Sequence, residues 1–150
     1  MILFDELYER FRRQHADIAQ AVEGLPDEAL DWVPGPEMNS INVLVAHTLG
    51  AERRLIGSVA LGEPSEGGRD EEFATRGLNS DEVKRRLAAA DEFLSTALPR
   101  ISVSDLDVIR TTHHNEQKSV AWTLLHALEH TGQHLGHIQI TRQLWEHKSN

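Results

Sequence analysis

The sequence predicts an all-α protein, a four-helix bundle with a long loop between its third and fourth helices. Two observations predict this class. Apolar residues recur at steps of three and four along four long segments, and the segments between them are polar or rich in glycine and proline. With 150 residues and 39% hydrophobic content, we expect one domain over residues 1–150 with a single core.

The four helices follow from their apolar stripes and from the residues at their ends. A side-chain oxygen of Asn39 or Ser40 suits the start of the second helix, and Asn79 with Glu82 resembles a capping box at the start of the third. Pro99 ends the third helix. The predicted helices cover residues 4–24, 41–61, 79–99 and 119–146. We expect neighbouring helices to be antiparallel, with sites built from side chains that project inward.

The remaining segments are predicted as loops. Residues 26–38 contain Pro34, Gly35 and Pro36, and residues 62–72 are polar and rich in glycine. Residues 99–119 alternate only weakly between apolar and polar side chains, which indicates an ordered loop with a short extended piece. A loop of this length inside a compact domain is more often functional than not.

Composition narrows the classes of function. The formal net charge of −9 opposes the phosphate neutralisation on which nucleic-acid binding depends, so we expect no nucleic-acid partner. The absence of cysteine excludes disulfides, thiolate metal sites and a cysteine nucleophile, so a thiol would have to come from a co-substrate. The N-terminal MILFDELYERF does not resemble a signal peptide, and no apolar run is long enough to span a bilayer. We therefore expect a cytoplasmic protein with no membrane partner.

Histidines are concentrated in HALEHTGQHLGH, which holds four of the nine in the chain. At 100° per residue these four lie within about 80° of one another on the last predicted helix. They are His126, His130, His134 and His137. The stripe continues through Trp122, Ile140 and Leu144, which are apolar, so we expect this face to point into the bundle.

A metal site is the chemistry that this pattern favours. Imidazoles four residues apart on a helix can share one ion, and His47, on an apolar face of the second helix, can supply a third. Such a site leaves a position open for water or a thiol. His126 with His130 has the same spacing as His130 with His134, so the spacing does not decide which pair binds.

Other readings of the histidines compete with this one. The group could be a hydrogen-bonded polar network, and His15 is interpreted as a structural core residue of that kind. HALEH matches the HxxEH pattern of inverted zinc proteases, but only Glu146 follows as a further acidic ligand. A carboxylate-bridged di-iron site would need Glu-x-x-His pairs, which this sequence lacks. The loop residues His113 and His114 could overhang the pocket, but adjacent histidines in a loop are usually just exposed.

The segments MNSINVLVAHTLGAERRLIG and LLHALEHTGQHLGHI resemble the DinB/YfiT-like superfamily of metal-binding four-helix bundles. The resemblance covers nearly the whole chain and implies that His47, His130 and His134 bind one divalent ion, Zn or Ni by imidazole preference. His126, Glu129 and His137 are then expected to support these ligands or line the pocket. Relatives often read His-Arg-Gly-Gln-Ile where this chain reads HLGHI, so Leu135 and His137 depart from the family pattern.

The resemblance also implies a function. Characterised members of the superfamily are isomerases and S-transferases that use mycothiol, bacillithiol or glutathione, so we expect a metal-dependent enzyme with a thiol co-substrate and a small electrophile. A metal-dependent hydrolase and a non-enzymatic metal-binding bundle are the alternatives. Because the family often dimerises, a homodimer is expected.

Overall fold

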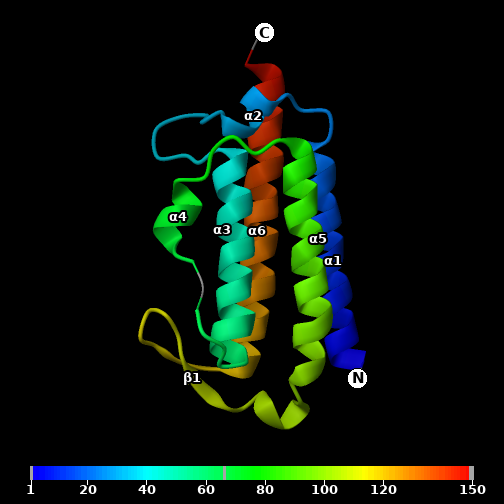
Figure 1. Cartoon of the computed structure of the whole chain (residues 1–150), viewed down its shortest axis with the longest axis vertical. Coiled ribbons are helices and arrows are strands. Elements are labelled where there is room, and N and C mark those ends of the chain that lie inside the picture. The colour runs from blue at the N-terminus through cyan, green and yellow to red at the C-terminus, as the bar shows by residue number, and fades with distance from the viewer. Residues whose placement is uncertain (1, 66, 149–150) are drawn as a thin grey trace.

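The computed structural model describes residues 2–65 and 67–148 and shows a four-helix bundle (Figure 1). The long helices are α1 (Ile2–Val22), α3 (Ile41–Arg53), α5 (Ser80–Ala97) and α6 (Val120–His147). The predicted caps are confirmed, since Ser40 Oγ accepts from the Val43 amide at 3.3 Å and Asn79 Oδ1 accepts from the Glu82 amide at 2.9 Å. Within the described residues, no helix is both long and apolar enough to cross a membrane.

The directions of the helices correct one expectation. α1 and α6 run in the same direction and pack against each other, while α3 and α5 both run in the opposite direction (Figure 1). Antiparallel neighbours were expected from the packing of four apolar helical stripes in a bundle. Here the connection from α3 to α5 runs back along the whole bundle, so α5 begins at the same end as α3.

Short elements occupy the segments predicted as loops. α2 (Asp27–Asp31) lies in the first of them, and α4 (Arg69–Phe73) lies in the connection from α3 to α5, so both segments are helical where a loop was expected. The predicted extended piece is confirmed as a hairpin of β1 (Ile109–Thr111) and β2 (Gln117–Ser119). Two 3-10 turns precede it, η2 (Leu98–Arg100) and η3 (Val103–Asp105).

The second predicted helix continues beyond α3 as a π-helical segment, η1 (Arg54–Ala60). This segment keeps its apolar side chains buried, among them Leu55, Ile56 and Val59. π-Helical turns are frequent at functional sites. Arg54, at the start of η1, reaches the candidate site described below.

The core consists of two apolar clusters with a polar layer between them. One cluster contains Phe11 and Leu94, and the other contains Ile18 and Leu87. His15 lies between Phe11 and Ile18 along α1 and is only 1% exposed. The expectation that His15 is a hydrogen-bonded core residue is therefore confirmed by its burial and by the contacts of the polar layer.

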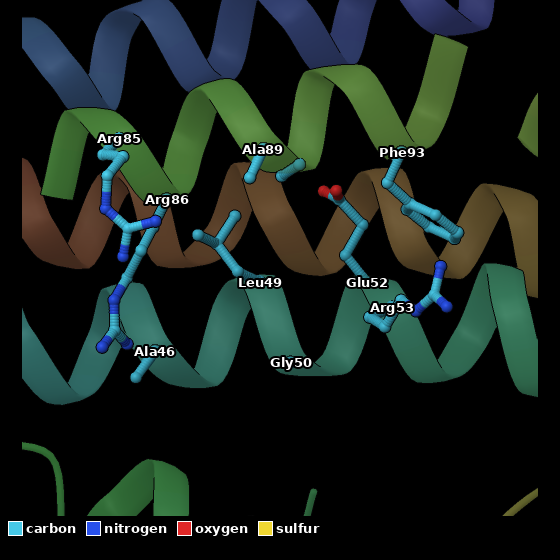
Figure 2. Close-up of a pocket in the computed structure, with 10 residues that line it drawn as sticks. Ala46, Leu49, Gly50, Glu52, Arg53, Arg85, Arg86, Ala89 and Phe93 are labelled. Atoms are coloured by element: carbon cyan, nitrogen blue, oxygen red, sulfur yellow. The ribbon is translucent and has the colours of Figure 1, made fainter. Parts of the chain in front are cut away.

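The polar layer connects all four long helices. The His15 ring bonds Asp91 Oδ1 of α5 at 2.7 Å through Nδ1 and Glu52 Oε2 of α3 at 3.1 Å through Nε2. The Thr131 hydroxyl of α6 shares its proton between the Ala127 carbonyl, at 3.0 Å, and the same Glu52 oxygen, at 3.3 Å. Figure 2 shows Glu52 projecting from α3 into the space between α3 and α5, where a groove of about 500 Å³ follows the seam.

Stability is expected to decrease as the pH rises through the alkaline range. Burial alone would lower the pKa of His15, but its bonds to Asp91 and Glu52 raise that pKa to about 9 in the folded protein. The unfolded value is near 6.5, so the stabilisation is complete below about pH 6.5 and is lost as the pH rises through about 9. Urea titrations should show a decrease of about 3 kcal/mol in the free energy of unfolding across this window.

The variant His15→Gln should flatten this dependence, and His147→Gln, at the exposed end of α6, should retain it. An equal slope in His15→Gln and in the unmodified protein would show that His15 is not the group responsible.

Candidate metal centre

Three imidazoles meet between α3 and α6. His47 extends from α3, and His130 and His134 extend from successive turns of α6, which packs beside α3 (Figure 1). His130 Nε2 lies 3.2 Å from His47 Nε2 and 3.2 Å from His134 Nε2. One nitrogen from each ring falls within 4.8 Å of the others. The structure therefore brings together the three histidines that the resemblance to the superfamily selects.

The spacing of these nitrogens suits one shared ion. Imidazole nitrogens bind zinc at about 2.0 to 2.1 Å, which places two ligands about 3.4 Å apart on a tetrahedron and about 2.9 Å apart on an octahedron. The observed separations of 3.2 Å lie between these values. All three donor nitrogens lie within 4.8 Å of one another, so the donor set suits a divalent ion.

The outer ring nitrogens of two of these histidines have their own partners. His47 Nδ1 donates to Glu72 Oε2 at 3.0 Å, and His134 Nδ1 lies 3.2 Å from His137 Nδ1. A proton held on Nδ1 leaves the Nε2 lone pair free for a metal, and such partners also fix the ring orientation. His137, expected near the pocket, thus lies behind His134 and faces its outer nitrogen.

The imidazoles of His130 and His134 are neutral at ordinary pH. Burial, together with the neighbouring His134 and His47 rings, lowers the pKa of His130 to about 3. Burial and the His47 ring likewise lower the pKa of His134 to about 4. Metal ligation requires the neutral form, so neither ring has to lose a proton before it can bind.

Glu72 is the site residue that the sequence analysis missed. It lies on α4, is buried, and accepts from both terminal nitrogens of Arg54 as well as from His47. A Cβ atom added at Gly50 would lie 2.6 Å from Glu72 Cδ, so the missing side chain leaves room for the carboxylate. A glycine inside a helix costs about 1 kcal/mol relative to alanine. The presence of Gly50 within a predicted helix was therefore the sequence signal that another group packs closely against this position.

A pocket of about 420 Å³ adjoins the imidazole cluster at His47 and His130. His113 and His114, in the turn between β1 and β2, are exposed and also line it. His126 also lines it and stacks on Trp122, with 4.5 Å between ring centroids and 18° between planes. The other lining residues are Ala51, Arg54, Leu55, Arg69, Thr112 and Glu116.

His126 and Glu129, both expected near the ligands, lie in different environments on α6. The ring centroids of His126 and His130 are 6.2 Å apart, and the side chain of Glu129 is 80% exposed, with its carboxylate 3.9 Å from His126 Nδ1. The structure thus places His126 in the pocket wall and Glu129 at the surface. This arrangement does not bring Glu129 between two histidine ligands, as the HxxEH reading would require.

The expectation that the whole histidine stripe points inward is wrong at both ends, because Trp122, Ile140 and Leu144 are exposed. The inward face of α6 instead carries threonines together with apolar residues. Thr131 and Thr141 are buried, and each donates its hydroxyl to the carbonyl four residues earlier, at 3.0 and 2.8 Å. These bonds satisfy the hydroxyls, which is why polar residues can occupy the face that packs on the other helices.

The fold and the histidine cluster define the class of protein as a four-helix bundle with a candidate metal centre between two of its helices. The DinB superfamily model matches residues 10–138, and this chain belongs to the DinB superfamily. No curated protein has a sequence that matches it significantly.

Solved structures share the fold at low sequence identity. A conserved protein from Enterococcus faecalis matches with a TM-score of 0.78 and 16% identity, over 93% of this chain and 95% of its own. YfiT from Bacillus subtilis, described as a probable metal-dependent hydrolase with an unusual four-helix bundle topology, matches with a TM-score of 0.75 and 14% identity, over 93% and 86%. A DinB-like protein from Bacillus cereus matches with a TM-score of 0.69 and 14% identity, over 87% and 84%.

The substitution Gly50→Ala is expected to weaken Zn²⁺ binding about tenfold or more while the protein remains folded. The new methyl group would displace the Glu72 carboxylate, and His47 would lose the partner that orients it. Competition with a chromogenic chelator measures the affinity, and circular dichroism checks the fold. The matched control is Gly136→Ala in α6, where an added Cβ meets nothing within 4 Å. Unchanged affinity in Gly50→Ala would show that Glu72 does not support the site.

Proposed function

We propose that this protein is a divalent-metal-dependent enzyme that activates a small nucleophile. His47, His130 and His134 hold one ion, Zn or Ni, through their Nε2 atoms. The observation that supports this proposal is the convergence of three imidazoles beside a pocket of about 420 Å³, with His130 Nε2 3.2 Å from the Nε2 atoms of both His47 and His134. Three protein ligands leave open coordination positions, which is the arrangement of catalytic rather than purely structural metal sites.

Residues around the three ligands would have distinct roles in such a site. A divalent ion supplies Lewis acidity, which lowers the pKa of a water or thiol at its open positions. Glu72 keeps the proton of His47 on Nδ1, and His137 faces the outer nitrogen of His134 in the same way. His126, stacked on Trp122 in the pocket wall, is the side chain placed to exchange a proton with a bound molecule. We assign no further role to the exposed Glu129.

A thiol is the nucleophile that the pocket favours. Among the described residues, the only carboxylate that lines the pocket is Glu116, which pairs with Lys118 at 3.6 Å, and Glu72 is already bound by His47 and Arg54. A thiol has an ordinary pKa of about 8.5 and needs little help to ionise, whereas water, at about 15.7, depends more on a general base, and for that role the pocket offers an imidazole such as His126 rather than a free carboxylate. We therefore propose transfer of a low-molecular-weight thiol to a small electrophile, or a thiol-dependent isomerisation.

Metal-dependent hydrolysis is the second candidate. It is supported by the similarity in fold to YfiT, which is described as a probable metal-dependent hydrolase. The same three imidazoles and the same pocket would serve it, with water in place of the thiol and His126 as the base.

The ligand set is tested by metal content. His130→Ala should abolish stoichiometric Zn²⁺ or Ni²⁺ after loading and desalting, because the Nε2 atom of His130 is the one that lies 3.2 Å from both other ligands. Inductively coupled plasma mass spectrometry measures the ratio of metal to protein. The control is His147→Ala at the exposed end of α6, which should bind one equivalent. Full metal content in His130→Ala would show that the ligand set is wrong.

The reaction class is tested by two substrate panels. Metal-loaded protein is incubated with glutathione, bacillithiol or mycothiol and monochlorobimane, and in parallel with ester and amide substrates. We expect metal-dependent thiol consumption that is lost in His47→Ala. Metal-dependent cleavage without a thiol would support hydrolysis instead. Bound metal with neither activity would favour a non-enzymatic metal-binding bundle.

A further inference from the structure

Arg69 is a pocket cation that forms no ion pair with a carboxylate among the residues that the structure describes. It lines the pocket beside the imidazole cluster, and within residues 2–65 and 67–148 it makes no ion pair. The other guanidinium of the pocket, on Arg54, is held by Glu72. A free guanidinium beside a cavity provides a planar set of donors that matches the two oxygens of a carboxylate.

Aromatic packing fixes Arg69 relative to the candidate metal ligands. Its guanidinium carbon lies 4.6 Å from the centroid of the Phe73 ring, one helical turn further along α4. The Phe73 ring in turn packs against His47, with 5.0 Å between centroids. A guanidinium held over an aromatic ring by cation–π attraction can still donate its N–H groups to a ligand.

The charges around the pocket favour an anion. Arg54 is balanced by Glu72, and Glu116 is balanced by Lys118 at 3.6 Å. Burial and the nearby His114 lower the pKa of His113, so its imidazole adds no charge near neutral pH. Arg69 therefore leaves this wall positive in a protein of net charge −9. A local positive field of this kind concentrates small anions, and a divalent ion would strengthen it.

We propose that the pocket binds a small carboxylate-bearing molecule, with its carboxylate on Arg69 and its reacting group at the imidazole cluster. The second half of this statement rests on the proposed function, and the carboxylate subsite rests on Arg69 alone. A thiol or electrophile with a carboxylate a few atoms from its reacting group is the corresponding substrate class.

The test compares two thiols that differ in one terminal group. Cobalt-loaded protein is titrated with mercaptopropionate and with mercaptopropanol, and the visible absorption of the cobalt reports binding. We expect Arg69→Gln to weaken mercaptopropionate binding about tenfold to a hundredfold and to change mercaptopropanol binding less than about twofold. Arg69→Lys should retain part of the preference for mercaptopropionate over mercaptopropanol, because lysine keeps the positive charge but lacks the paired N–H donors of the guanidinium. Arg13→Gln, an exposed arginine of α1, is the charge-matched control and should bind both thiols normally.

The outcomes separate this inference from the proposed function. Suppose that Arg69→Gln binds cobalt and that its affinities for the two thiols fall equally or do not fall at all. This result would overturn the carboxylate subsite and would leave the proposed metal site unaffected. Failure to bind cobalt would overturn the proposed function. In that case calorimetric titration of the metal-free protein and of Arg69→Gln with mercaptopropionate decides the subsite, and equal affinities in the two proteins would refute it.

Discussion

His15, buried at the middle of α1, uses both ring nitrogens to hold carboxylates from two other helices, Asp91 on α5 and Glu52 on α3. Thr131 of α6 shares the Glu52 oxygen, so one hydrogen-bonded layer fixes the relative positions of all four long helices. Apolar side chains above and below this layer would tolerate some sliding, whereas a buried ion pair does not, because breaking it leaves an uncompensated charge at a cost of about 3 to 5 kcal/mol. The layer therefore sets the register of the helices that carry the imidazoles.

The connection from α3 to α5 carries side chains that complete the surroundings of the candidate metal ligands on α3 and α6. Since this connection returns along the bundle, α4 comes to lie beside α3. Within five residues it delivers a carboxylate to His47, an aromatic ring against the same imidazole, and the Arg69 guanidinium to the pocket. A short antiparallel turn between α3 and α5 would have provided none of these groups. The topology thus has a direct chemical consequence at the candidate metal centre.

Much of the fold and part of the site could be predicted from the sequence. Periodicity and caps are local, so the long helices and their starting residues were predicted close to their observed positions. The meeting of His47 with His130 followed from inward-facing stripes and from resemblance to the superfamily. Glu72 could not be found in this way, because its position depends on how a polar connection folds back over α3. The exposed ends of the α6 stripe were missed because threonines, satisfied by their own helix, replaced apolar residues on the buried face.

The polar layer and the candidate metal centre share no side chain, but both are built on α3 and α6. On α6, His130 and Thr131 are adjacent, and on α3, His47 and Glu52 are five residues apart. Thr131 and Glu52 are bonded to each other, and His130 and His47 approach to 3.2 Å. Metal–nitrogen bonds tolerate only small changes in length, so a displacement of α6 along α3 by a fraction of an ångström would spoil the ligand geometry. The buried Glu52 is thus best understood as the residue that holds α6 at the position where its imidazoles can share one ion with His47.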